Sequence, residues 1–214
     1  ASGHVGGTIA ARLLDAGKKV RVVARGADGL KGLGARGAEV VAGAIDDPAL
    51  LKRAFQGAAA AYVLLPPSFA PGYRALQDRC AAAIGEALEA AKVPRVLTLS
   101  SVGADRPSGN GPIAGLHVLE QRLDRIRGLA PLHLRPGYFF ENHLAAVGLV
   151  KATGALGGPL RGDVKMGQIA ARDIGEVAAR RLLALDWTGR TVQDLHGQRD
   201  LTMSEAASAL GEAI

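Results

Sequence analysis

Glycines stand at positions 3 and 6 in the opening stretch ASGHVGG, directly before an apolar helical pattern. A glycine-rich turn that opens a helix leaves backbone amides free, and a helix N-terminus favours an anion such as a pyrophosphate. The spacing matches the second half of a GxxGxxG loop, whose first glycine would precede Ala1. We therefore predict a dinucleotide phosphate site at Gly3, His4, Val5 and Gly6.

The strand-like segment VRVVA follows the first helix. Arg25 comes directly after it, 22 positions after Gly3. In dinucleotide-binding βαβ units the residue that contacts the adenosine ribose comes about 20 positions after the glycines. An acidic residue there would bind the ribose 2′-hydroxyl of NAD, whereas a guanidinium suits a 2′-phosphate. Arg25 therefore favours NADP(H) over NAD(H), and the alternative is an ordinary surface arginine.

Further candidate site residues follow the later strand-like segments. We expect the rigid exit at Leu65 and Pro66 to line the ribose and nicotinamide side of a cofactor, and Ser100 to contact the cofactor or cap a turn. The remaining cofactor-binding candidates follow one strand: Pro136, Gly137 and Tyr138. An aromatic residue there covers a nicotinamide or packs in the core, and both interpretations stay open.

No catalytic residue is assigned. The weak candidates are Tyr138 and His117, with His143 as a further proton donor, although a lone histidine more often packs or caps. The sequence has no Cys, His or carboxylate cluster with metal-ligand spacing and no GxSxG motif, so we predict no metal site and no acyl transfer.

Short apolar segments alternate with helical patterns, which predicts a doubly wound α/β fold with a parallel sheet. The expected strands are residues 20–24, 39–42, 61–65, 96–100, 132–135 and 192–195, and the expected helices are residues 4–16, 29–35, 48–55, 73–91, 113–127, 142–153, 173–185 and 204–214. Asp46 and Asp47 are predicted to cap the helix that begins at Pro48. We expect a nucleotide-binding domain over residues 1–140 and a small C-terminal substrate lobe over residues 141–214.

The strand that normally precedes a glycine-rich turn is missing ahead of Gly3. In a doubly wound sheet that first strand is central, so its loss would leave two neighbours without a partner and would open the core. We therefore expect several apolar residues and a glycine before Ala1 in the native polypeptide. Residues 1–214 expressed alone are expected to be insoluble or molten.

Composition narrows the possible partners. The 214 residues carry a net charge of +6, which favours anionic ligands, but the basic residues are scattered and aromatic residues make up only 4%. We therefore expect no direct nucleic-acid binding. The sequence has no apolar run near the roughly 20 residues of a membrane span and no signal-peptide pattern, so we expect a cytoplasmic protein without membrane contact. The lone Cys80 lies in an alanine-rich helical stretch and is expected to be structural.

Six motifs in order give the chain a family resemblance. They are ASGHVGG with VRVVAR, LTLSSVGAD, LHVLEQRL, HLRPGYFFENHL, ARDIGEVAARRLL and LHGQRDLTMSEAASALGEAI. The chain resembles the NmrA-like branch of the atypical short-chain dehydrogenase/reductase superfamily. That resemblance implies a Rossmann domain that binds NAD(P)H and a role in one of two classes. The first is a reductase of a quinone or similar small acceptor, and the second is a redox sensor that acts through a protein partner.

The sequence departs from the wider superfamily at the catalytic motif. Counting back from Glu120, the Tyr and Lys of YxxxK fall on Pro112 and Leu116, so neither is present. Reduction of a quinone by direct hydride transfer needs little acid or base help from the protein, so this loss is compatible with an oxidoreductase. The sequence also departs from the family pattern at Ala44, which replaces the acidic residue that would contact the adenine. This contact is therefore left to Ile45 or the backbone.

Overall fold

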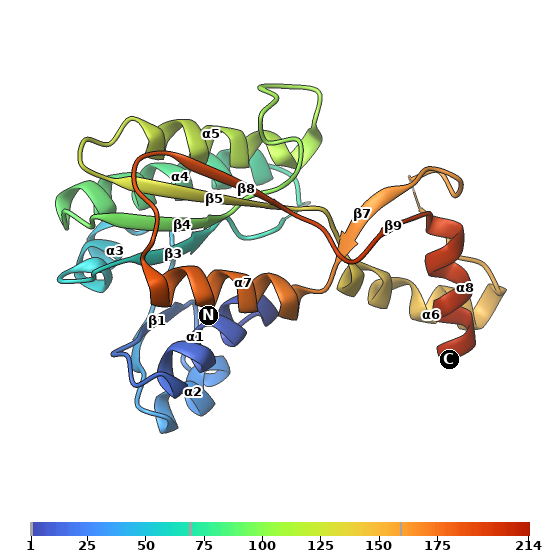
Figure 1. The fold of residues 1–214 in the computed structure, drawn as a ribbon, viewed down its shortest axis with the longest axis horizontal. Coiled ribbons are helices and arrows are strands. Elements are labelled where there is room, and N and C mark those ends of the chain that lie inside the picture. The colour runs from blue at the N-terminus through green and yellow to red at the C-terminus, as the bar shows by residue number, and fades with distance from the viewer. Residues whose placement is uncertain (1, 69, 159) are drawn as a thin grey trace.

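Parallel strands with helices on both faces make up most of the structure (Figure 1). The computed structural model describes residues 2–68, 70–158 and 160–214. One sheet pairs β1 (Arg21–Ala24) with β2 (Glu39–Ala42), and a second has the order β3 (Ala61–Leu64), β4 (Arg95–Leu99), β5 (Ala130–Pro136) and β8 (Thr191–Leu195), all parallel. These bounds confirm the predicted strands to within one or two residues. The predicted α/β fold with parallel strands is therefore present.

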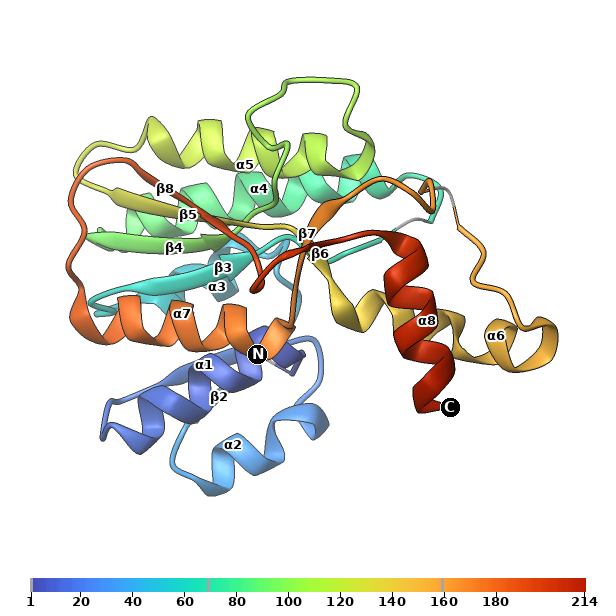
Figure 2. The same ribbon diagram turned by 45° about the vertical axis from the view of Figure 1, so that its right-hand side comes forward.

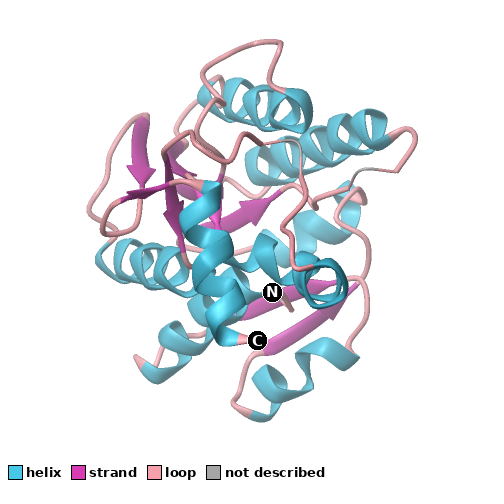
Figure 3. Ribbon diagram, turned by 90° about the vertical axis from the view of Figure 1, so that its right-hand side faces the viewer, coloured by secondary structure: helices cyan, strands magenta, loops and turns pink. Residues whose placement is uncertain are grey.

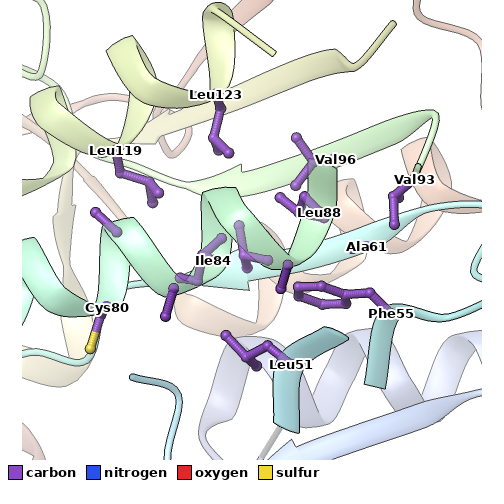
Figure 4. Packing of buried hydrophobic residues seen from close by; sticks show 14 of the residues in the cluster. Leu51, Phe55, Ala61, Cys80, Ile84, Leu88, Val93, Val96, Leu119 and Leu123 are labelled. Atoms are coloured by element: carbon purple, nitrogen blue, oxygen red, sulfur yellow. The ribbon is translucent and has the colours of Figure 1, made fainter. Parts of the chain in front are cut away.

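The helices cover the four-stranded sheet from two sides (Figure 2). On one face, α1 (His4–Asp15) and α7 (Ala171–Ala184) pack on Leu97, Leu132 and Leu134 of β4 and β5. On the other, α3 (Pro48–Phe55), α4 (Tyr73–Ala90) and α5 (Ala114–Asp124) form a core that includes Phe55, Ile84, Leu88 and Val96 (Figure 4). A short 3₁₀ turn (Asp28–Leu30) and α2 (Lys31–Ala35) join β1 to β2. Because both faces are covered, most side chains of the central strands are apolar, and the polar Thr98 and His133 among them are buried and hydrogen-bonded to each other.

A smaller lobe lies at the carboxyl end of the sheet (Figure 1). It contains β6 (Tyr138–Phe139), a 3₁₀ segment (Phe140–Ala146), α6 (Val147–Thr153), β7 (Met166–Ile169), β9 (Asp200–Leu201) and α8 (Met203–Ala213). The short strands β6, β7 and β9 were not predicted. The predicted lobe over residues 141–214 also includes α7 and β8, which the structure places in the main layer, against α1 and β5 respectively. None of the helices in the described ranges combines the length and apolarity that crossing a membrane requires.

The cap of α3 shows how local sequence sets one of these boundaries. Asp47 accepts hydrogen bonds from the backbone amides of Ala49 and Leu50 at 2.9 and 3.0 Å, as predicted for an N-cap followed by proline. Asp46 does not share this role, because its carboxylate forms an ion pair with Arg79 at 3.5 Å. The predicted pair of caps is therefore a single cap.

The sheet of β1 and β2 does not pair with the four-stranded sheet in the described part of the chain, and the strands form separate groups in Figure 3. A hollow lined by residues of β1 and β3 lies between the two sheets. Apolar side chains from the helices on both sides reach into it, among them Ile9 of α1 and Ile84 of α4. Tyr62 of β3 also lines it, and its buried hydroxyl has no hydrogen-bond partner among the described residues. Burial raises the pKa of Tyr62.

Close packing of α1 on α7 fixes the position of the glycine-rich N-terminus. A Cβ atom on Gly175 of α7 would lie 2.6 Å from Cβ of Thr8 and 3.2 Å from the carbonyl oxygen of Val5, both in α1. Only a glycine permits this approach, and an invading methyl group would have to push on the α1 backbone. Gly175 therefore sets the distance between the two helices.

We predict that Gly175→Ala lowers the free energy of unfolding by about 1–3 kcal/mol, because overpacking forces the helices apart. The matched control is Gly211→Ala in α8, where an added Cβ meets nothing within 4 Å. That control should be neutral or stabilising by up to about 1 kcal/mol, since alanine is the better helix former. Denaturant titrations of both variants measure the effect, and equal stabilities would contradict it.

Candidate functional site

The hollow between β1 and β3 has a volume of about 2040 Å³ and extends to the carboxyl ends of β3, β4 and β5. Ligand sites of open α/β sheets lie at this edge. The structure brings together every residue predicted to bind a cofactor, because all of them line this hollow: Gly3, His4, Val5, Gly6, Arg25, Leu65, Pro66, Ser100, Pro136, Gly137 and Tyr138. The shared location is a geometric finding, and their contacts with a cofactor stay a prediction.

The N-terminus of α1 opens into the hollow without a side-chain cap. Gly3 is the N-cap residue, and the first helical hydrogen bond runs from the amide of Gly7 to the carbonyl of Gly3 at 2.8 Å. The amides of His4, Val5 and Gly6 therefore have no acceptor within the helix. An added Cβ on Gly3 would meet nothing within 4 Å, so a ligand can approach the backbone closely. This arrangement suits a phosphate group.

Arg25 lies just beyond the end of β1 and lines the same hollow. Its side chain is exposed and forms no hydrogen bond or ion pair with any other residue that the structure describes. The neighbouring arginines differ, since Arg21 pairs with Glu39 at 2.8 Å and Arg12 pairs with Glu176 at 2.7 Å. Arg25 is therefore a free cation that lines the same hollow as the N-terminus of α1.

Ser100 forms part of the inner wall of the hollow and belongs to a buried network of hydrogen-bonded polar side chains. The Ser100 hydroxyl donates to Oε1 of Glu120 at 2.5 Å, and Arg135 donates to the same carboxylate through Nε at 3.0 Å and Nη2 at 2.5 Å. Glu120 is 2% exposed, and the Arg135 side chain is 12% exposed. The hydrogen bond to Glu120 raises the pKa of Arg135, so the guanidinium stays charged. Sequence reasoning used Glu120 only as a landmark, because its pairing with Arg135 requires α5 to lie against β5.

Tyr138 is half-buried, and its position leaves the contact with a nicotinamide a prediction. Its ring packs against His143 with 5.2 Å between the centroids, and it also lines the hollow. His143 is 8% exposed, and its Nε2 atom lies 2.9 Å from Oε1 of Gln168, so this histidine is committed to the packing of the lobe.

The structure does not bring His117 to the hollow. Its Nδ1 atom lies 2.8 Å from the carbonyl oxygen of Ala104, and its side chain borders a small surface depression between α4 and α5. A different histidine, His196, lines the hollow and was not predicted. Its ring lies where a Cβ on Gly167 would be, with Nδ1 2.0 Å from that position. The only sequence signal for this close contact was a glycine in each of the two segments that meet here, Gly167 and Gly197.

The positions of the absent YxxxK motif lie beside this site. Leu116 lines the hollow, and the backbone carbonyl of Pro112 accepts a hydrogen bond from Gln77 at 3.0 Å. Neither side chain carries a proton donor. No group of three or more His, Cys, Asp or Glu side chains in the described ranges is arranged to hold a metal ion.

A free helix N-terminus, a free arginine after the next strand and parallel strands that end around one hollow define a nucleotide-binding α/β protein. Residues 1–183 match the model of a family described as NAD(P)H-binding, and the chain belongs to that family. This match confirms the NmrA-like resemblance of the six motifs at the level of an NAD(P)H-binding family.

Two curated relatives are each 29% identical to this chain. One is the (4-alkanoyl-5-oxo-2,5-dihydrofuran-3-yl)methyl phosphate reductase of Streptomyces griseus subsp. griseus, for which the match covers 100% of this chain and 72% of the relative. The other is the NAD(P)H azoreductase of Xenophilus azovorans, with 99% and 71% covered. Both of these distant relatives are therefore reductases, and one of them is an NAD(P)H-dependent enzyme.

Solved structures show the same fold. An NADPH-dependent quinone oxidoreductase from Escherichia coli, complexed with NADPH, matches with a TM-score of 0.82 and 23% identity over 99% of this chain and 72% of that one. The triphenylmethane reductase of Citrobacter sp., complexed with NADP(H), matches with a TM-score of 0.78 and 20% identity over 99% and 73%. At these identities the likeness establishes the fold alone.

We predict that Arg135→Met lowers the free energy of unfolding by about 3–5 kcal/mol, because it leaves the buried Glu120 carboxylate without its cation. The double variant Glu120→Met/Arg135→Met should recover most of this loss, since it removes both charges together. Urea titrations of the two variants measure the difference. A single variant as stable as the unsubstituted protein would show that Glu120 is not held as a buried anion.

Proposed function

We propose that this protein is an NADPH-dependent oxidoreductase that reduces a quinone or a similar small, flat acceptor by direct hydride transfer. The observation that carries the proposal is the single hollow shared by the uncapped N-terminus of α1, the unpaired Arg25 and the carboxyl ends of the central strands. Family membership and the reductase activities of the distant relatives support the same class of enzyme, an oxidoreductase.

The residues present fit NADP(H) at this position. The amides of His4, Val5 and Gly6 would hold the pyrophosphate, and Arg25 would pair with the 2′-phosphate. Leu65, Pro66 and Pro136 offer apolar surfaces for the ribose and nicotinamide side of the ligand. When bound, the reduced nicotinamide supplies the hydride.

The far wall of the hollow suits a flat, mostly apolar acceptor. Its side chains include Val102, Tyr138, Phe139 and Met166, which belong to the β4 exit, β6 and β7. Such a wall orients an acceptor by stacking and apolar contact and excludes water from one face. Orientation accounts for much of the rate in a hydride transfer of this kind, and solvent can supply the accompanying proton.

The proposal is tested with the full polypeptide by calorimetric titration of NADPH, followed by addition of a benzoquinone while nicotinamide absorbance is recorded. We expect NADPH to bind and to be oxidised at a steady rate. Tight binding without turnover would instead favour the redox-sensing alternative, in which the protein signals the cofactor's redox state to a partner. Failure to bind either NADPH or NADH would refute both the reductase and the redox-sensing function.

Cofactor choice gives a sharper prediction. Arg25→Asp should weaken NADPH binding about 10- to 100-fold, because it removes the cation that faces the 2′-phosphate and introduces a repelling carboxylate. NADH, which lacks that phosphate, should bind equally well or better. Dissociation constants for both cofactors measure the switch, and Arg127→Asp, at an exposed arginine that does not line the hollow, serves as a control for lost positive charge. Equal losses for NADPH and NADH would contradict the assignment.

We further propose that β1 and β3 belong to one doubly wound sheet, completed by an apolar strand that lies between them. The hollow between the two strands, the apolar side chains that reach it from both helical layers and the buried Tyr62 hydroxyl support this arrangement. A strand there would bury these side chains on both faces, as the neighbouring parallel strands do.

Adding five apolar, β-branched residues and a glycine ahead of the chain should therefore raise its melting temperature and sharpen its transition. An extension of equal length made of glycine and serine is the matched control and should change neither. Circular dichroism melts compare the three proteins. Indistinguishable melts for both extensions would contradict the added strand.

A further inference from the structure

The hydroxyl of Ser100 has a fixed direction. Ser100 is 5% exposed, follows β4 and lines the hollow, and its backbone amide donates to the carbonyl of Leu134 at 2.8 Å. Its single hydroxyl proton points to Oε1 of Glu120 at 2.5 Å. A hydroxyl has one proton to donate and two lone pairs that accept. The side of Ser100 that faces the hollow therefore presents only lone pairs.

Arg135 makes this direction obligatory. Its guanidinium donates to both oxygens of Glu120, and Glu120 is almost completely buried. A carboxylate in a two-point pair with arginine is ionised and accepts hydrogen bonds without donating any. Glu120 therefore cannot reverse the bond and free the proton of Ser100. Turning that proton toward the hollow would leave one lone pair of a buried anion unsatisfied, which is costly.

We propose that Glu120 and Arg135 are positioning residues that hold Ser100 as a hydrogen-bond acceptor, so that the ligand group at Ser100 is an N–H or O–H donor. This inference rests on the proposed function, in which the ligand of the hollow is NADP(H). A nicotinamide carboxamide or a ribose hydroxyl meets the requirement, whereas a phosphate or carbonyl oxygen does not. The inner wall thus differs from the α1 end of the hollow, which offers donors to an anion.

The test compares dissociation constants for NADPH and for its 3-acetylpyridine analogue, which has a methyl group in place of the carboxamide nitrogen. Ser100→Ala should weaken NADPH binding about 3- to 10-fold, the range expected for one hydrogen bond. If the donor is the carboxamide, the analogue should bind both proteins equally. If it is a ribose hydroxyl, both ligands should lose affinity together, which supports the same inference. Ser208→Ala is the control, because that hydroxyl donates to the backbone carbonyl of Ser204 at 3.1 Å in α8 and does not line the hollow.

A second arm separates positioning from mere structural support. Glu120→Met/Arg135→Met frees the Ser100 hydroxyl to rotate and should weaken NADPH binding by a similar factor. Combined with Ser100→Ala, the double substitution should cause no further loss, because both act through the same hydrogen bond. Losses that add, or a Ser100→Ala variant that binds NADPH as tightly as the unsubstituted protein, would overturn the inference. If the unsubstituted protein bound no NADPH at all, the proposed function would fall with it.

Discussion

The uncapped amides at the start of α1 are the feature on which the rest of the site depends. They lack a partner within the helix because the first turn of any helix leaves its donors unpaired, and no side chain caps them here. Their direction is set by the contact between Gly175 of α7 and the backbone of α1. Since α7 follows β7 and leads to β8 at the edge of the sheet, a segment late in the sequence positions the earliest functional residues.

Charge is distributed unevenly around the hollow. At one end of the hollow Arg25 is exposed and the amides at the start of α1 have no acceptor within the helix, and both features favour an anion. At the inner wall Ser100 is hydrogen-bonded to Glu120, whose ion pair with Arg135 is buried and neutral overall. A buried pair of this kind contributes little net stability, but it fixes the direction of the groups bonded to it. The long axis of a dinucleotide, anionic in the middle and apolar at the nicotinamide end, is complementary to this gradient.

The lobe at the carboxyl end contributes side chains of β6 and β7 to the lining of the hollow. Its three short strands meet where Gly137, Gly167 and Gly197 allow backbones and the His196 ring to lie in contact. Side chains at these positions would separate the crossing segments. Because β5 and β8 continue directly into this crossing at Gly137 and His196, which both line the hollow, the lobe is attached to the main sheet at the edge of the hollow.

The sequence by itself determined the strands of the main layer, most helices and most of the residues proposed for the hollow. Buried parallel strands and glycine-bounded helices leave strong local patterns, and the carboxyl ends of such strands meet at one edge. Tertiary structure alone decided that His117 faces away from this edge, that His196 reaches it and that Arg135 pairs with Glu120. It also decided that α7 and β8 join the main layer. These outcomes depend on how α5, α7 and the lobe pack, and packing between distant segments leaves no periodic signal in the chain.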